Sequence, residues 1–197
     1  MKRLAHLFAT LALVLSVSGC LVRSIYPICS ENESIKVPGL LGTWQDEKGE
    51  VTAIISKSGA NTYRVVYLEN EKPAIFFGVA AKFGGKMFLD LIPISNSAKN
   101  GLEEMSSIPA HVVFRVKLDN NRLEYAYLDP KWMKASIKSG AIKISLLFTV
   151  DCETDKKEPD MQSITLDAST EEIGMLLASV AGNEKAFTKP EELKRVK

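Results

Sequence analysis

The sequence lacks three features that would point directly to a biochemical class. Neither sign of charge is in excess, because 25 Lys and Arg residues stand against 24 Asp and Glu residues in 197, so nothing favours nucleic acid as a partner. Only one long apolar run exists, near the start, which excludes a polytopic membrane protein. After residue 20 the chain has only one histidine and two cysteines, too few for a usual zinc site. The rest is 46% hydrophobic and 25% charged, which is typical of one globular domain.

The one apolar run has the features of a secretory signal. Lys2 and Arg3 form a short basic segment, and an apolar core follows from Leu4 to about Val17. That core is too short for a comfortable membrane span. Residues 1–19 are therefore predicted to be a signal peptide.

The end of this segment carries a more specific pattern. Val17-Ser18-Gly19-Cys20 resembles the lipobox of bacterial lipoproteins. The resemblance implies cleavage before Cys20, a diacylglycerol on its thiol and an acyl group on its new amino group, with each buried CH₂ contributing about 0.8 kcal/mol to anchoring. Leu21, in place of Asp, resembles the class sorted to the outer membrane, facing the periplasm. The alternative is an ordinary cleaved signal followed by an incidental Cys20.

Two further cysteines remain in the mature chain. In an oxidising periplasm Cys29 and Cys152 have only one possible pairing, and we expect a disulfide between them. Such a bridge would contribute about 3–5 kcal/mol in the chain-entropy model. The alternative is two unpaired, partly buried thiols.

The mature chain divides into a short N-terminal segment and one domain. Prolines and polar residues interrupt residues 20–38, which are predicted to be a lipid-anchored tether, and residues 39–197 form a single β-rich domain. Apolar residues recur there with a period of two, and Gly84-Gly85 and Asn120-Asn121 mark tight hairpins. The fold class is mainly β, an antiparallel barrel or strongly bent sheet of about eight to nine strands. The expected strands are 42–46, 51–57, 62–68, 74–82, 86–91, 110–118, 122–128, 142–150 and 161–167.

Two short helices are expected between or after the strands. Asp129 is a good N-cap followed by Pro130, which predicts a helix over 131–139. Ser169 and Glu172 form a capping-box pattern before an apolar stripe, which predicts a helix over 170–181. A last polar turn of helix is expected over 190–196.

A family resemblance rests on Gly42-Thr43-Trp44. This triplet resembles the Gly-x-Trp that opens the first strand of lipocalins and related calycin barrels, where the Trp plugs the closed end, often under an Arg. The lipocalin Thr-Asp-Tyr signature is absent, since Thr154-Asp155 is followed by Lys156. The layout, with a Ser169–Glu172 motif near the end, also resembles a group of bacterial lipoproteins without known activity. The simpler interpretation makes Trp44 a large core aromatic.

Chemistry-bearing patterns are few. His111 is the only histidine after the signal, and we expect an exposed or hydrogen-bonded strand residue rather than a catalytic base. Asp151, Glu153 and Asp155 have the spacing of a calcium loop, but Lys156 replaces the required Gly. Gly84-Gly85-Lys86 lacks the other positions of a phosphate loop. We therefore expect no enzyme activity, no catalytic residues, no metal and no cofactor.

Aromatic residues are the remaining indication of function. In a small barrel they either fill the interior or line a cavity for one small ligand. The leading hypothesis is a non-enzymatic binding module for a small apolar ligand. The alternative is an envelope assembly protein with a filled core, using loop 93–108 or helix 170–181 as its contact. The aromatics on predicted strands or their edges are Tyr63, Tyr67, Phe76, Phe77, Phe83, Phe88, Phe114, Tyr125, Tyr127 and Phe148.

Overall fold

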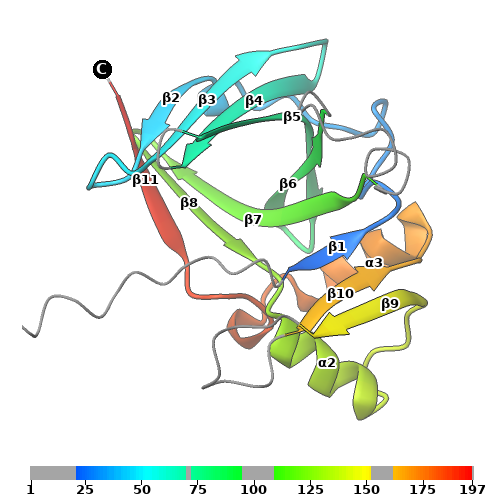
Figure 1. Ribbon diagram of the computed structural model, residues 1–197. Coiled ribbons are helices and arrows are strands. Elements are labelled where there is room, and N and C mark those ends of the chain that lie inside the picture. Colours follow the sequence, from blue (N-terminus) through cyan, green and yellow to red (C-terminus); the bar gives the residue numbers. More distant parts are fainter. Residues whose placement is uncertain (1–20, 70–71, 95–108, 152–161, 197) are drawn as a thin grey trace, which may run out of the picture.

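The fold is a closed eight-stranded antiparallel barrel with a smaller layer of strands and helices against one side (Figure 1). The computed structural model describes residues 21–69, 72–94, 109–151 and 162–196. The predicted fold class, mainly β with an antiparallel barrel, is confirmed. Cys20, Cys152, most of loop 93–108 and residues 153–161 lie outside the described residues.

The barrel is closed by consecutive antiparallel pairing, with β11 between β8 and β2 and with β6 joined to β7. Closure leaves none of these strands with a free edge along its whole length. Each of the strands predicted from the sequence has a counterpart among the described residues. The barrel strands are β2 (Gly42–Gln45), β3 (Val51–Lys57), β4 (Thr62–Glu69), β5 (Lys72–Phe83), β6 (Lys86–Pro93), β7 (His111–Asp119), β8 (Arg122–Tyr127) and β11 (Glu191–Arg195).

Three further strands extend the sheet from the beginning of β7. β1 (Val22–Ser24) pairs antiparallel with His111 and Val112 and parallel with β10 (Gln162–Leu166), which pairs with β9 (Leu146–Asp151). The segment expected to be a tether is therefore part of the fold. Leu21 accepts a backbone hydrogen bond from Ile164 at 3.0 Å, and Ile28 is buried. β1 pairs with strands that are distant in the sequence, and this pairing orders a stretch whose own residues favour no regular structure.

The hairpin predictions are confirmed by backbone geometry. Gly84 and Gly85 join β5 to β6 with φ of 53° and 76°, and Asn120 joins β7 to β8 with φ of 43°. Glycine and asparagine tolerate this left-handed region, which two-residue hairpin turns require. The glycine pair is thus a turn and not a phosphate loop.

Both predicted helices are confirmed, with the caps that the sequence indicated. In α2 (Pro130–Lys138) the Asp129 carboxylate accepts from the backbone N–H of Trp132 at 2.8 Å. In α3 (Thr170–Val180) Ser169 and Glu172 form the reciprocal capping box. None of the helices in the described part of the chain is long and apolar enough to cross a membrane.

The expected final turn of helix is wrong, because that stretch is strand β11. Glu191–Lys194 pair with β8, and Lys194 and Arg195 pair with β2. Only Leu193 among the five residues is apolar, and it is buried in the barrel. The free energy of closing the barrel overrides the helical preference of a Glu- and Lys-rich segment.

Side chains form two separate cores. The first lies inside the barrel and includes Trp44, Ile55, Leu89 and Leu193. The second lies between the outer wall of the barrel and the layer of α2, α3 and β10, and includes Phe88, Met133, Leu166 and Leu177. Because strand residues alternate between faces, each barrel strand on this side contributes to both cores.

Candidate functional site

The barrel interior contains a cavity of about 60 Å³ lined only by apolar and aromatic side chains. Residues of six strands point into it, as the period-two pattern of the sequence implied. The lining residues are Ala53, Ile55, Val65, Tyr67, Leu89, Leu91, Phe114, Val116, Leu123, Tyr125 and Leu193. The barrel core is therefore not completely filled.

Trp44 and Arg195 close one end of this barrel. Trp44 is fully buried, and its indole N–H donates to the Leu40 carbonyl at 2.8 Å. The guanidinium of Arg195 lies 4.1 Å from the centroid of the Trp44 ring and donates to the carbonyls of Leu41 and Gly39 at 2.7 and 2.6 Å. This cation–π stack with two charged hydrogen bonds forms a fixed floor. The position that the Gly-x-Trp resemblance implied for Trp44 is thus observed, and Trp44 is also a core aromatic.

The same geometry explains the glycine of the triplet. Gly42 has φ of 135°, and a Cβ atom there would collide with Nη1 of Arg195. Glycine alone adopts this positive φ without strain and leaves room for the Arg195 guanidinium. Gly42, Trp44 and Arg195 therefore act as one structural unit.

The opposite end carries phenols and carboxylates. We refer to Tyr67, Tyr125, Tyr127 and Glu191 as the mouth. The Tyr125 hydroxyl donates to Glu191 Oε2 at 2.5 Å, and the Phe114 ring meets Tyr125 and Tyr127 edge-on at centroid distances of 5.9 and 6.4 Å. Each phenol is partly buried.

Burial first, and nearby carboxylates second, raise the pKa values of the mouth phenols. Burial, followed by the charges of nearby carboxylates, raises the pKa of Tyr67 to about 12. Burial and the hydrogen bond to Glu191 raise the pKa of Tyr125 strongly, and burial with the Glu191 and Asp129 charges raises that of Tyr127. All three phenols therefore stay neutral near pH 7.

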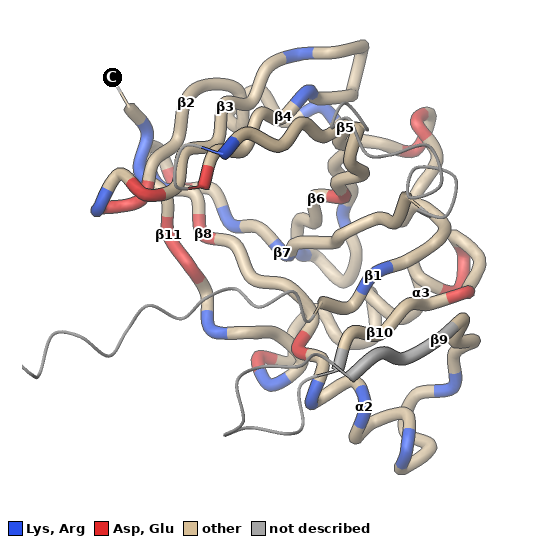
Figure 2. The backbone as a smooth tube through the Cα atoms, in the orientation of Figure 1, with Lys and Arg blue, Asp and Glu red and all other residues tan. Residues whose placement is uncertain are grey.

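β11 links the two ends and carries opposite charges along its length. It begins with Glu191 and Glu192 and ends with Lys194 and Arg195, as Figure 2 shows. The acidic beginning reaches the mouth, whereas Arg195 caps the floor. Sequence reasoning missed Glu191 and Arg195 because it assigned this strand to a helix.

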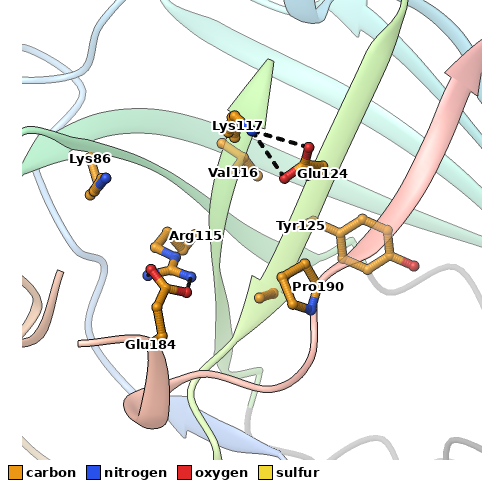
Figure 3. A pocket seen from close by; sticks show the side chains of 9 residues that line it. Lys86, Arg115, Val116, Lys117, Glu124, Tyr125, Glu184 and Pro190 are labelled. Carbon is orange, nitrogen blue, oxygen red and sulfur yellow. Dashed lines mark hydrogen bonds and ion pairs between the residues drawn. The ribbon is translucent and has the colours of Figure 1, made fainter. Parts of the chain in front are cut away.

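A second, larger cavity of about 210 Å³ lies on the outer face of β7 and β8 (Figure 3). Four of its five charged residues form two ion pairs, and Lys86 is the fifth. Arg115 binds Glu184 through two hydrogen bonds of 3.0 and 2.6 Å, and Lys117 lies 3.2 Å from Glu124. Arg115 also donates to the Ala181 carbonyl and lies over the Phe187 ring. We favour the smaller interior cavity because most of the charges in the outer cleft pair with one another.

His111 has a carboxylate partner on the outer wall. Its Nδ1 lies 2.9 Å from Oδ2 of Asp90, which is 1% exposed and also accepts from the backbone N–H of Ile28 at 3.1 Å. Ser24 lies opposite His111 in the β1–β7 register, but its hydroxyl accepts from the Tyr26 N–H. Among the described residues no serine or cysteine is hydrogen-bonded to His111. The pair therefore ties the N-terminal segment to the barrel.

The predicted disulfide and lipidation stay predictions. Cys29 is a buried, free thiol, and burial with the nearby Asp90 and Glu33 charges raises its pKa to about 11. Its expected partner Cys152, and the lipidation site Cys20, lie outside the described residues. Within the described ranges no group of His, Cys, Asp or Glu side chains is placed to hold a metal ion. Two of the three residues of the acidic 151–155 spacing also fall outside those ranges.

Comparisons with protein-family models, with curated proteins and with solved structures found no match to this chain.

Proposed function

We propose that this protein is a lipid-anchored binding module of the cell envelope that holds a small apolar ligand inside its barrel. The observation that carries the proposal is the interior cavity, whose lining is entirely apolar and aromatic. Empty apolar cavities bind apolar guests because the guest restores dispersion contacts that the lining lacks. Trp44 and Arg195 block one end, so a ligand would enter through the mouth.

The proposed anchor has a direct structural consequence. The carbonyl of Leu21, the residue after Cys20, already accepts a hydrogen bond from the body of the fold, and β1 begins at Val22. A lipid on Cys20 would therefore hold the folded domain against the membrane surface rather than at the end of a tether. The proposed location is the outer membrane, facing the periplasm, because Leu21 follows the cysteine.

The binding proposal is tested by native mass spectrometry on the Cys20→Ser domain purified from an envelope extract without detergent. We expect additional mass that disappears on denaturation. Ala53→Leu places three more carbon atoms in the cavity and should reduce the bound fraction, whereas Ile54→Leu, on the adjacent outward-facing and exposed position, should not. A bare chain that also fails to take up hexan-1-ol would contradict the proposal.

Overpacking costs about 1–3 kcal/mol, so Ala53→Leu requires a check of folding by circular dichroism. Val65→Leu adds a single carbon atom to the same lining and serves as the milder variant. If both variants fold and both retain the ligand, the ligand does not occupy the interior cavity.

The location is tested by density-gradient fractionation of membranes. The wild-type protein should band with the outer membrane, and Cys20→Ser should appear in the soluble fraction. Banding with the inner membrane would contradict the sorting proposal without affecting the cavity.

The second candidate function is an envelope assembly protein. The described residues leave β9 paired only with β10, and Leu146 and Leu147 on it are 38% and 44% exposed. A free edge with exposed apolar side chains suits addition of a strand from a partner. Crosslinking from residue 147 would identify such a partner if the barrel proves empty.

A further inference from the structure

The mouth combines three features beside the apolar cavity: tyrosine rings, a carboxylate that accepts a hydrogen bond from one of them, and no basic partner for that carboxylate among the described residues. Tyr67 and Tyr125 line the cavity together with Phe114, and the Phe114 ring contacts both Tyr125 and Tyr127. Glu191 closes over Tyr125 with one carboxylate oxygen, Oε2. Among the residues described, no Lys or Arg forms an ion pair with Glu191. Its carboxylate therefore has no basic side chain paired with it in that part of the chain.

The charges that act on these phenols are all of one sign. Carboxylates of Glu69, Glu191 and Asp46 act on Tyr67, and those of Glu191 and Asp129 act on Tyr127. Two basic residues lie near the mouth along the chain: Lys72 opposite Glu69, and Lys189 next to Thr188, whose N–H donates to the Tyr127 carbonyl. Both are exposed to solvent. An anionic group at the mouth would meet repulsion, whereas a cation would meet attraction from both the carboxylates and the ring faces.

We propose that the ligand is a small amphiphilic cation, whose apolar part fills the barrel cavity and whose ammonium group lies among Tyr67, Tyr125, Tyr127 and Glu191. This inference rests on the proposed binding function and specifies the ligand class for the same site. Tyrosine rings with a carboxylate are a chemically suitable cage for an alkylated ammonium, which prefers ring faces to strong hydration.

The cavity limits the size of the apolar part. A water-sized group needs about 10–15 Å³ of such volume, so about 60 Å³ accommodates roughly four to six of them in contact. A short alkyl chain fits this space, and a long acyl chain does not. The ligand class is therefore a short-chain or compact ammonium compound.

The test is a matched series of three probes with the same short chain: hexyltrimethylammonium, hexan-1-ol and hexanesulfonate. Each is titrated into the Cys20→Ser domain and followed by calorimetry and by nuclear magnetic resonance of the aromatic side chains. We expect the cation to bind at least about five-fold more tightly than the alcohol, and the sulfonate to bind least.

Glu191→Gln provides the decisive variant, because the amide keeps the size of the side chain and an oxygen that can accept from Tyr125. It should lower the affinity for the cation about five-fold and leave that for the alcohol unchanged. Glu192→Gln is the matched control, since Glu192 is the next residue on β11 and is paired with Arg122 at 3.2 Å. It should change neither affinity.

The outcomes separate the two proposals. If the cation and the alcohol bind equally well and Ala53→Leu weakens both, the cavity binds ligands but the cationic class is overturned. Preference for the sulfonate, or a cation preference that survives Glu191→Gln, overturns it as well. If no probe binds, the proposed binding function fails, and the inference fails with it.

Discussion

The two ends of the barrel use polar groups in opposite ways. At the floor, the guanidinium of Arg195 stacks on Trp44 and donates to two backbone carbonyls, so the charge is fully engaged within the protein. At the mouth, Glu191 accepts one hydrogen bond from Tyr125 and has no ion pair among the described residues. One end is built for rigidity and the other leaves a charge available.

This difference shows how to separate structure from function in a small barrel. A buried charge that is completely paired contributes to the stability of the native state, because removing one partner leaves the other unsatisfied. A carboxylate without a paired base contributes little to stability, and titratable groups with shifted pKa values beside a cavity are typical of binding sites. Substitutions at the floor should therefore affect folding, whereas those at the mouth should affect binding and titration.

The largest effect is expected for Trp44→Ala. Trp44 is fully buried and supports both the cavity floor and the Arg195 stack, so the substitution should lower the free energy of unfolding by about 3–5 kcal/mol. Urea unfolding followed by circular dichroism measures this. A loss below about 1 kcal/mol would contradict the assignment of the floor as a structural unit.

Arg195→Met should lower the free energy of unfolding by about 2–4 kcal/mol, since it removes the cation–π stack and two charge-assisted hydrogen bonds while keeping an apolar stem. Arg195→Lys is the control for charge alone. It should recover only part of the loss, because an ammonium cannot reproduce the planar fork that reaches Leu41 and Gly39 together. Full recovery by Lys would show that geometry is unimportant there.

Gly42→Ala should cost about 1–3 kcal/mol, because alanine is strained at φ of 135° and its Cβ would displace Arg195. In the Arg195→Met background the collision is relieved but the backbone strain remains, so the cost should become smaller. Urea unfolding of the two single variants and the double variant measures this coupling. Strictly additive losses would show that Gly42 and Arg195 act independently.

Local sequence patterns predicted most of the fold. Alternating apolar residues gave the barrel strands from β2 to β8, and turn and cap residues such as Gly85, Asn120 and Ser169 placed the boundaries. β1 was missed because three residues are too few to show a period, and its order comes from parallel pairing with β10. Its pairing partners are distant in sequence, so no local signal could have found it.

The candidate site was predictable only in part. The sequence indicated that aromatics on strands would face either a filled core or a cavity, and Tyr67 and Tyr125 prove to line the cavity. Glu191 and Arg195 were not found, because a Glu-Glu-Leu-Lys-Arg segment has the composition of a helix and becomes a strand only by closing the barrel. The one signal that could have indicated a strand here was the single apolar residue, Leu193, between polar neighbours.

The smallest effect on stability, and the sharpest contrast with the floor, is expected at the mouth. Glu191 is exposed, so Glu191→Gln should change the free energy of unfolding by less than about 0.5 kcal/mol. It should nevertheless lower the pKa of Tyr125 and of Tyr127, because the negative neighbour is lost, while Glu192→Gln leaves both unchanged. Phenolate absorbance in a pH titration measures these shifts.

Tyr67 supplies the matching pH dependence. Its pKa of about 12 in the folded protein lies above the value near 10 of an unfolded chain, so the native state holds the proton longer. The resulting stability is present in full below about pH 10 and is lost as the pH rises towards 12. Tyr67→Phe should remove this contribution, so the difference in unfolding free energy between wild type and variant should narrow over that interval. A difference in unfolding free energy that stays constant from about pH 9 to about pH 12 would mean that the mouth does not hold the Tyr67 phenol neutral. The contrast between the two ends of the barrel would then lose its electrostatic basis.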